Sequence, residues 1–113
     1  MATDIRAELR FVGVSAQKVR LVLDMVRGKP ANQALDTLKF VNKVAAHHVR
    51  KVLASAVANA EENFGVSRDE LLVYTITADE APTRKWRRFG ARGRFKPILR
   101  RQSHITVVLR ERA

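Results

Sequence analysis

An eighteen-residue stretch, RKWRRFGARGRFKPILRR at positions 84–101, carries the side chains most suited to binding chemistry. It contains nine Lys and Arg, seven of them Arg, and no Asp or Glu. Guanidinium groups make planar, two-pronged contacts with phosphate, and Arg and aromatic side chains stack on unpaired bases. Trp86, Phe89 and Phe95 are interleaved with these cations, which favours RNA as the partner. The alternatives are a solvated flexible loop, and a Trp86 that only covers a sheet edge.

The positive charge is concentrated in this part of the chain. Residues 1–80 contain 11 basic and 10 acidic side chains, whereas residues 81–113 contain 11 basic side chains and a single acidic one, Glu111. A cationic segment of this density attracts polyanions and repels itself in their absence. Nucleic acid is the leading candidate partner, and an anionic membrane surface is the second.

A second basic cluster precedes an apolar helical pattern. Ser15, Gln17, Lys18 and Arg20 lie at the predicted start of a helix. Free N–H groups at a helix start, with cations beside them, form a natural phosphate site. A capped and solvated helix face explains the same residues equally well.

The remaining polar residues do not predict catalysis or a metal site. His47 and His48 are adjacent on a predicted helix, so they point about 100 degrees apart and do not converge on one metal. Asp79 and Glu80 are neighbours in a predicted strand and face opposite sides. The chain has no Cys, no Gly-rich phosphate loop and no Ser/His/Asp set. We expect no enzyme activity, no cofactor and no metal.

Three helices are predicted from apolar spacing. Ser15 caps the first, which Gly28 and Pro30 end; Pro30 begins the second; Asn42 caps the third, and Gly65 stops it. The apolar positions at helical spacing are Val19, Val22, Leu23 and Val26 in the first helix, Ala31, Ala34, Leu35 and Leu38 in the second, and Ala45, Val49, Val52, Leu53, Ala56, Val57 and Ala60 in the third.

Three strands are predicted from alternation. In residues 6–14, Leu9 and Phe11 face one side. From residue 71, Leu72, Tyr74, Ile76 and Ala78 point one way, and in the last strand Ile105, Val107 and Leu109 do so. The last two strands should pair antiparallel and join the first in a sheet of about three strands, covered by helices on one face. The predicted fold class is α+β.

The 24 residues between Asp79 and His104 are predicted to continue the two strands as a long protruding β-hairpin. We call residues 81–102 the arm, and residues 1–80 with 103–113 the body, of a single domain spanning 1–113. A lone hairpin is marginal in water, and this one lacks an apolar face. We therefore expect the arm to be mobile in the isolated protein.

The location is predicted to be cytoplasmic. No apolar run reaches the roughly 18 residues of a membrane span, and the N-terminal residues lack the basic-then-apolar order of a signal peptide. A membrane-binding helix would need its basic residues on the polar face of the same segment, and in this chain the basic residues are concentrated elsewhere. We therefore expect no membrane partner.

Four separated motifs resemble the bacterial large-subunit ribosomal protein L22 (uL22) family in unbroken register over about residues 13–110. They are SAQKVRLVLDMVRGK (15–29), ASAVANAEEN (54–63), DEAP (79–82) and ARGR with ILRRQSHITVVL (91–109). The resemblance implies an α+β body on the large subunit near the exit of the nascent-chain tunnel. It also implies a hairpin that passes through 23S-type rRNA, with a tip that narrows the tunnel.

The resemblance implies a role in architecture and assembly of the ribosome. The implied partners are large-subunit rRNA, other large-subunit proteins near the tunnel, and the nascent polypeptide; no homo-oligomer is expected. Residues, spacing and resemblance together give the predicted RNA-binding set: Ser15, Gln17, Lys18, Arg20, Arg84, Lys85, Trp86, Arg87, Arg88, Arg92, Gly93, Arg94, Lys96, Arg100, Arg101, Ser103 and His104. The predicted tunnel-lining tip is Arg88, Phe89, Gly90, Ala91 and Arg92.

The chain departs from the family pattern at a few positions. Gly13 replaces a usual Arg, Ala81 a usual Gly, and Phe95 a small residue. The tip motif PRA reads Phe89, Gly90, Ala91 here. The body and arm stay intact, whereas the contacts of the tip are open.

The alternative function is a free-standing DNA-bending ribbon protein, which would be a dimer.

Overall fold

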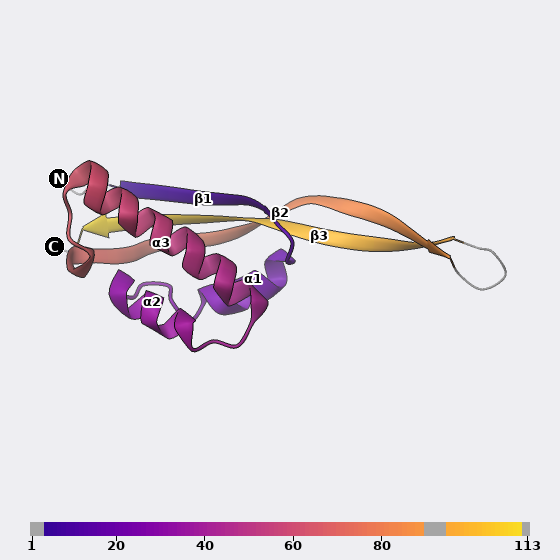
Figure 1. Ribbon diagram of the computed structural model, residues 1–113, viewed down its shortest axis with the longest axis horizontal. Helices are drawn as coiled ribbons and strands as arrows, with labels where there is room; N and C mark the ends of the chain where they lie inside the picture. The colour runs from indigo at the N-terminus through magenta and orange to yellow at the C-terminus, as the bar shows by residue number, and fades with distance from the viewer. Residues whose placement is uncertain (1–3, 90–94, 112–113) are drawn as a thin grey trace.

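The computed structural model describes the backbone of residues 4–89 and 95–111, and the side chains of 4–82 and 101–111. Three helices lie on one face of a three-stranded antiparallel sheet, which confirms the predicted α+β class (Figure 1). In chain order the elements are β1 (Asp4–Val12), α1 (Ala16–Leu23), α2 (Ala31–Lys39), α3 (Val44–Phe64), a 3-10 helix η1 (Arg68–Glu70), β2 (Leu71–Phe89) and β3 (Phe95–Glu111).

β3 is the central strand of the sheet, in the order β1-β3-β2. It pairs antiparallel with both neighbours, and its alternate residues Ile105, Val107 and Leu109 are fully buried beneath the helices. This alternation was predicted, because a half-buried strand turns every second side chain to the core. The predicted antiparallel pairing of the last two strands is confirmed as well.

The hairpin extends far beyond the rest of the sheet. β2 and β3 stay paired from Leu71↔Glu111 to Phe89↔Phe95, while β1 pairs with β3 only up to Ser103. The molecule therefore measures 63 × 25 × 18 Å, with the two-stranded ribbon projecting from one end. Residues 90–94, which join the two strands and include part of the predicted tip, lie outside the described residues.

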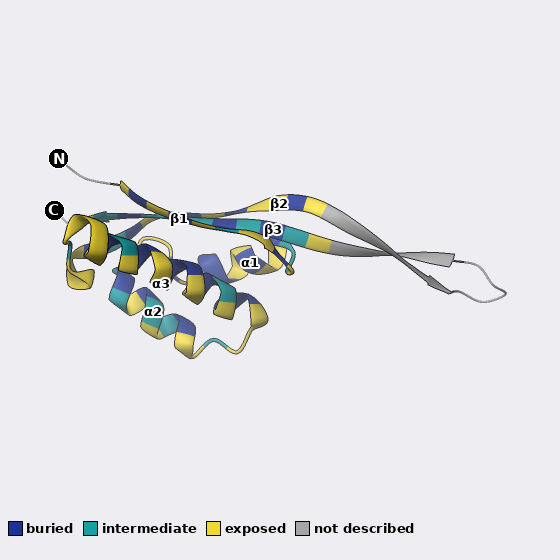
Figure 2. Ribbon diagram, turned by 45° about the horizontal axis from the view of Figure 1, so that its top comes forward, coloured by how far each residue is buried: buried dark blue, intermediate teal, exposed yellow. Residues whose placement is uncertain are grey.

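The core lies between the helices and the sheet (Figure 2). α3 contributes the predicted stripe and also buries Ala46, and its four buried Ala residues let the helix approach its neighbours closely. Gly65 ends α3 in the left-handed conformation with φ 65°, as predicted, because glycine adopts it without a steric cost. The buried residues of α3 are Ala45, Ala46, Val49, Val52, Leu53, Ala56, Val57 and Ala60.

The predicted orientation of the first strand is wrong at its end. β1 spans residues 4–12 instead of 6–14, and it buries Ile5 and Ala7, with Leu9 partly buried. An irregularity between Leu9 and Val12 shifts the register, and Phe11 adopts φ 55°. Phe11 is consequently 57% exposed instead of facing the core.

A second irregularity changes the side chains at the start of β2. Val73 pairs with Leu109 and Thr75 pairs with Val108, so Tyr74 is the extra residue of a bulge. Leu71 and Val73 are buried before the bulge, and Ile76 and Ala78 after it. The predictions for Ile76 and Ala78 are confirmed, but those for Leu72 and Tyr74 are wrong, because one inserted residue reverses the alternation.

The helix boundaries differ slightly from the prediction. α1 ends at Leu23, and turns follow it to Gly28, although Val26 remains buried. Pro30 and Lys43 occupy the N-cap positions of α2 and α3, so Pro30 is not the first helical residue and Asn42 is not the cap. The segment before α2 instead pairs with β2: Gly28 N donates to Val73 O at 3.1 Å, and Val73 N to Lys29 O at 2.9 Å. Among the described residues, no helix is long and apolar enough to cross a membrane.

Candidate nucleic-acid interface

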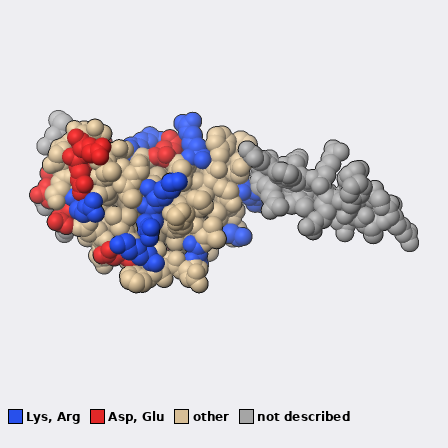
Figure 3. Space-filling model, in the orientation of Figure 1, with Lys and Arg blue, Asp and Glu red and all other residues tan. Residues whose placement is uncertain are grey.

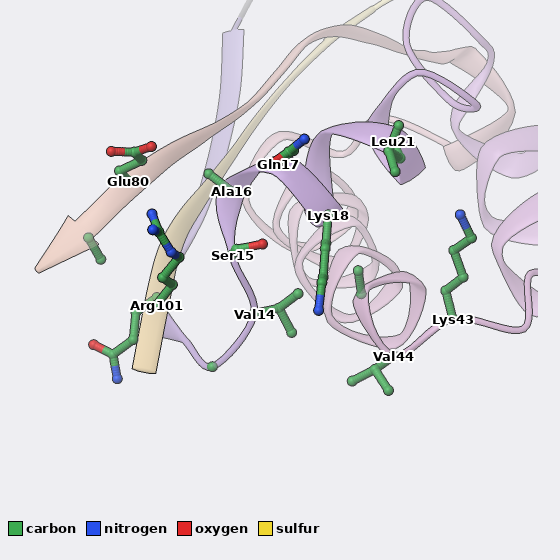
Figure 4. Close-up of a pocket in the computed structure, with 14 residues that line it drawn as sticks. Val14, Ser15, Ala16, Gln17, Lys18, Leu21, Lys43, Val44, Glu80 and Arg101 are labelled. Atoms are coloured by element: carbon green, nitrogen blue, oxygen red, sulfur yellow. The ribbon is translucent and has the colours of Figure 1, made fainter. Parts of the chain in front are cut away.

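A groove of about 1060 Å³ opens where the arm leaves the body (Figure 4). Its wall is built from the start of α1, the start of α3 and the two strands of the hairpin. We call it the root groove. The lining residues are Gly13, Val14, Ser15, Ala16, Gln17, Lys18, Leu21, Lys43, Val44, Ala45, Glu80, Ala81, Arg101 and Gln102.

The charge of the root groove is mostly positive. Lys18, Lys43 and Arg101 reach it from α1, the α3 N-cap and β3, and Glu80 is the only carboxylate of the lining. Within the described side chains, no ion pair involves any of these three cations. Three cations without an ion pair outnumber the one carboxylate of this lining, so the groove attracts a polyanion.

The start of α1 adds hydrogen-bond donors to the groove. Ser15 is the N-cap, as predicted, and its carbonyl accepts from Val19 N at 3.1 Å, but its hydroxyl makes no capping hydrogen bond. The first N–H groups of α1 therefore lack the usual side-chain acceptor. Donors without an internal acceptor, beside Lys18, suit a phosphate group.

Arg20 has a partner inside the fold. Its Nε and one terminal nitrogen donate to the carbonyl oxygen of Ala78 at 3.1 and 2.9 Å. Arg27 makes a similar contact with the carbonyl of Ile76 at 3.0 Å. β2 is an edge strand, so these carbonyls have no strand beside them, and the two guanidinium groups satisfy them. The predicted RNA contact of Arg20 stays a prediction beside this structural role.

Ser103 fixes one wall of the root groove from within. It is fully buried, and its Oγ donates to the carbonyl oxygen of Val14 at 2.8 Å. This bond ties β3 to the loop that leads into α1, across 89 residues of sequence. A hydroxyl buried in this way positions Ser15 and Lys18 relative to Arg101.

His104 explains the unusual backbone of Phe11. The N–H of Phe11 donates to Nδ1 of His104 at 3.0 Å, and the two rings meet edge to face at 4.9 Å. Because Nδ1 accepts, the proton of the neutral imidazole lies on Nε2. The ring therefore offers its remaining nitrogen as a donor next to the base of the arm.

The structure brings together only some of the predicted RNA-binding residues. Ser15, Gln17, Lys18 and Arg101 line one groove, whereas Arg20, Ser103 and His104 make internal contacts around it. The side chains of Arg84, Lys85, Trp86, Arg87, Arg88, Lys96 and Arg100, and all of Arg92, Gly93 and Arg94, lie outside what the structure describes. The sequence analysis did not identify Lys43, because only the folding of the α2–α3 turn against α1 brings this residue to the groove. Its position next to Asn42, the predicted cap of the third helix, was the one feature of the sequence that could have indicated it.

The other candidate residues are the two histidines of α3 and the acidic pair of β2. The rings of His47 and His48 are 5.8 Å apart, and the pKa of His48 is lowered mainly by partial burial, with smaller effects of His47 and Lys51. Among the described side chains, those of residues 4–82 and 101–111, no group of three metal-type ligands occurs. Asp79 and Glu80 are exposed in β2.

One protein-family model matches the chain. It is described as ribosomal protein L22p/L17e and matches residues 7–110, from β1 to β3 and including both strands of the hairpin. Proteins of that family are structural components of the large ribosomal subunit that bind its RNA, and they are not enzymes. The match agrees with the resemblance of the four sequence motifs. The chain therefore belongs to the ribosomal protein L22p/L17e family.

Proposed function

We propose that the root groove and the arm bind large-subunit (23S-type) rRNA and promote its folding during assembly, while the tip of the arm lines the nascent-polypeptide exit tunnel. In this proposal the body docks at the outside of the subunit and the arm passes into the RNA interior. Other large-subunit proteins near the tunnel and the nascent polypeptide are the further partners, and the location is the cytoplasmic ribosome.

The observation that carries the proposal is the juxtaposition of a cationic groove and a long cationic ribbon. Lys18, Lys43 and Arg101 face one hollow where the hairpin leaves the body. The hairpin continues from there as two paired strands whose sequence, between Arg84 and Arg101, contains no acidic residue. A cationic groove that leads into a paired ribbon of this sequence suits a folded RNA that surrounds the arm and reaches its root.

In this proposal both the root groove and the arm contact phosphate groups. Lys18, Arg101 and the helix start would hold phosphates at the surface, and the Arg-rich arm would neutralise several RNA segments at once. Each phosphate contact releases counterions, so affinity for rRNA should fall with salt by roughly 0.7 to 0.9 of log-log slope per contact.

The first experiment asks whether the native protein sediments with large ribosomal subunits and stays there after a moderate-salt wash. We expect retention, together with salt-sensitive binding of the purified protein to large-subunit rRNA. A soluble, RNA-free dimer that binds plain duplex DNA equally well would overturn the proposal in favour of a DNA-bending ribbon protein.

The proposed position of the tip needs its own experiment. The chain contains no Cys, so Ala91→Cys creates a unique attachment point for a short photocrosslinker. On assembled subunits, we expect the crosslinker of the Ala91→Cys variant to react with a stalled nascent chain. The same crosslinker attached through Ala54→Cys, on the exposed face of α3, should not react. Equal crosslinking from both positions, or from neither, would remove the tunnel from the proposal.

A further inference from the structure

The turn between α2 and α3 presents a fully exposed aromatic ring. Phe40 is the C-cap of α2 and is 88% exposed, the largest exposure among the large hydrophobic side chains described. Its neighbours hold it in this orientation: Leu38 is buried, Val41 packs against the core, and Val41 N donates to Leu38 O at 3.4 Å. The exposure of Phe40 is therefore built into an anchored turn.

The surroundings of this ring are cationic and partly apolar. Lys43 follows three residues later, without an ion-pair partner among the described side chains, and Val44 beside it is 71% exposed. Lys39 lies 3.9 Å from Asp36, both well exposed, so this pair is weak and easily exchanged for a phosphate. No Asp or Glu occurs between residues 37 and 60.

A second exposed Phe ring on the helical layer, Phe64, has acidic residues close to it in the sequence. Phe64, at the other end of α3, is 52% exposed but follows Glu61 and Glu62 and precedes Asp69 and Glu70. A polyanion would be repelled from Phe64 and attracted to Phe40. Of the two exposed Phe rings on the helical layer, only Phe40 combines a stacking surface with cations.

The exposed turn is also continuous with the root groove. Lys43 and Val44 line the groove, where Leu21 of α1, 55% exposed, adds a second apolar contact (Figure 4). An RNA strand held by Lys18 and Arg101 would therefore also meet Lys43, and Phe40 precedes Lys43 by three residues on the same turn. Aromatic rings beside Lys or Arg are the usual platform for an unpaired base.

We propose that Phe40, with Lys43, forms a stacking platform for one unpaired rRNA base at the edge of the root groove. The inference rests on the proposed function and adds to it a contact by the body with a base, in addition to phosphate contacts. An apolar protein partner would also cover Phe40, but the cations and the continuity with the groove favour RNA.

The test compares four variants by their affinity for protein-free large-subunit rRNA. Because Phe40 is exposed, Phe40→Ala should leave the thermal unfolding midpoint unchanged and yet weaken binding at least about fivefold. Phe40→Trp should retain or improve affinity, since it keeps the aromatic face. Phe40→Leu should lose most of the rRNA affinity that Phe40→Ala loses. The matched control Phe64→Ala should bind rRNA like the wild type.

Each outcome decides one question. If Phe40→Ala binds like Phe64→Ala, or Phe40→Leu binds like the wild type, the stacking platform is wrong while the proposed function stands. Full RNA affinity of Phe40→Ala, with loss of the variant from assembled subunits only, assigns the ring to a protein partner and also overturns the inference. A wild-type protein that does not bind the rRNA at all removes the proposed function itself.

Discussion

The cationic side chains at the two ends of the body differ in whether they have ion-pair partners. At the end away from the arm, Arg110 of β3 pairs with Asp4 of β1 and lies over the ring of Tyr74 at 3.4 Å, and Arg68 pairs with Glu61 at 2.9 Å. At the arm end, Lys18, Lys43 and Arg101 surround the root groove without such partners among the described residues. Figure 3 shows the largest group of carboxylates at the first end.

This difference teaches where an outside partner is needed. The far end is electrostatically closed, because Arg110 joins β3 to β1 and β2, and Arg68 joins η1 to α3. The arm end is open, because its three groove cations make no ion pair among the described residues and outnumber the one carboxylate, Glu80, which is unfavourable until an anion arrives. The net charge of residues 1–80 is close to zero and therefore does not reveal this difference between the two ends.

The largest effect should appear in the amide exchange of the free protein. β2 and β3 are paired with each other both in the body and in the arm. Only in the body is β3 also flanked by β1, and only there is the sheet covered by helices. A lone two-stranded ribbon opens with little cost, whereas body amides need near-global unfolding. We expect amides of residues 84–89 and 95–100 to exchange on the order of 10³-fold faster than those of residues 105–109.

Hydrogen exchange followed by NMR or mass spectrometry measures this contrast directly. Binding of rRNA should then protect the arm amides and leave the body amides nearly unchanged. Equal protection of both parts in the free protein would mean that the ribbon is stable without RNA, and the contrast between the two parts would be lost.

The next effect concerns the open cations themselves. Replacing Lys18, Lys43 and Arg101 with Ala should weaken rRNA binding at least about a hundredfold, after discounting contacts of about 1.5 kcal/mol each for solvent exposure. The log-log salt slope should also fall by roughly two, at about 0.7 per contact for single strands. Filter binding or fluorescence titration across a salt series gives both numbers.

A matched triple variant separates position from net charge. Arg6, Arg50 and Lys51 are exposed cations outside the root groove, so their replacement with Ala removes the same charge. We expect this control to lose much less affinity. Equal losses in the two triple variants would show that only the overall charge matters, and the root groove would not be a site.

The sequence predicted the elements of both ends better than their contacts. Periodicity located the helices and the paired strands, because the apolar stripe of α3 and the alternation of Ile105, Val107 and Leu109 report burial directly. It could not reveal the bulge at Tyr74 or the turn at Phe11, because one inserted residue leaves no sign in composition. The orientation of the β2 side chains before Tyr74 depended on that one residue.

The candidate site was predicted in part, for a related reason. Ser15 and Lys18 were identified by the helix start, and Arg101 by the basic run. That these residues meet, and that Lys43 joins them, follows from the packing of α1 and α3 against β3, which connects positions far apart in the chain. The internal hydrogen bonds of Arg20 and Ser103 are tertiary as well, so the sequence did not indicate them.

The buried hydroxyl of Ser103 provides a smaller test at the arm end. Ser103→Ala removes its bond to the Val14 carbonyl and should lower the free energy of unfolding by about 1–2 kcal/mol, because that carbonyl loses its partner in a partly buried loop. Urea unfolding measures the loss. Ser55→Ala, on the exposed face of α3, should change stability by less than about 0.5 kcal/mol.

The smallest effect should come from the closed end. The hydrogen bond from Arg110 is the main reason that the pKa of Asp4 lies below its ordinary value of 3.8. A carboxyl with a lowered pKa in the folded state binds fewer protons there, so its stabilisation is present above pH 3.8 and is lost as the pH falls through the lower value. Asp4→Asn should therefore be slightly less stable than the wild type at neutral pH, and this gap should close in acid.

Thermal unfolding of both proteins between pH 7 and about pH 2 measures this gap, and rRNA affinity at neutral pH provides the comparison with the arm end. Because Asp4 lies at the opposite end of the sheet from the root groove, Asp4→Asn should bind rRNA like the wild type. If Asp4→Asn instead changed rRNA affinity as strongly as a single groove cation does, the two ends would be coupled. The separation into a closed end that holds the sheet together and an open end that meets RNA would then be wrong.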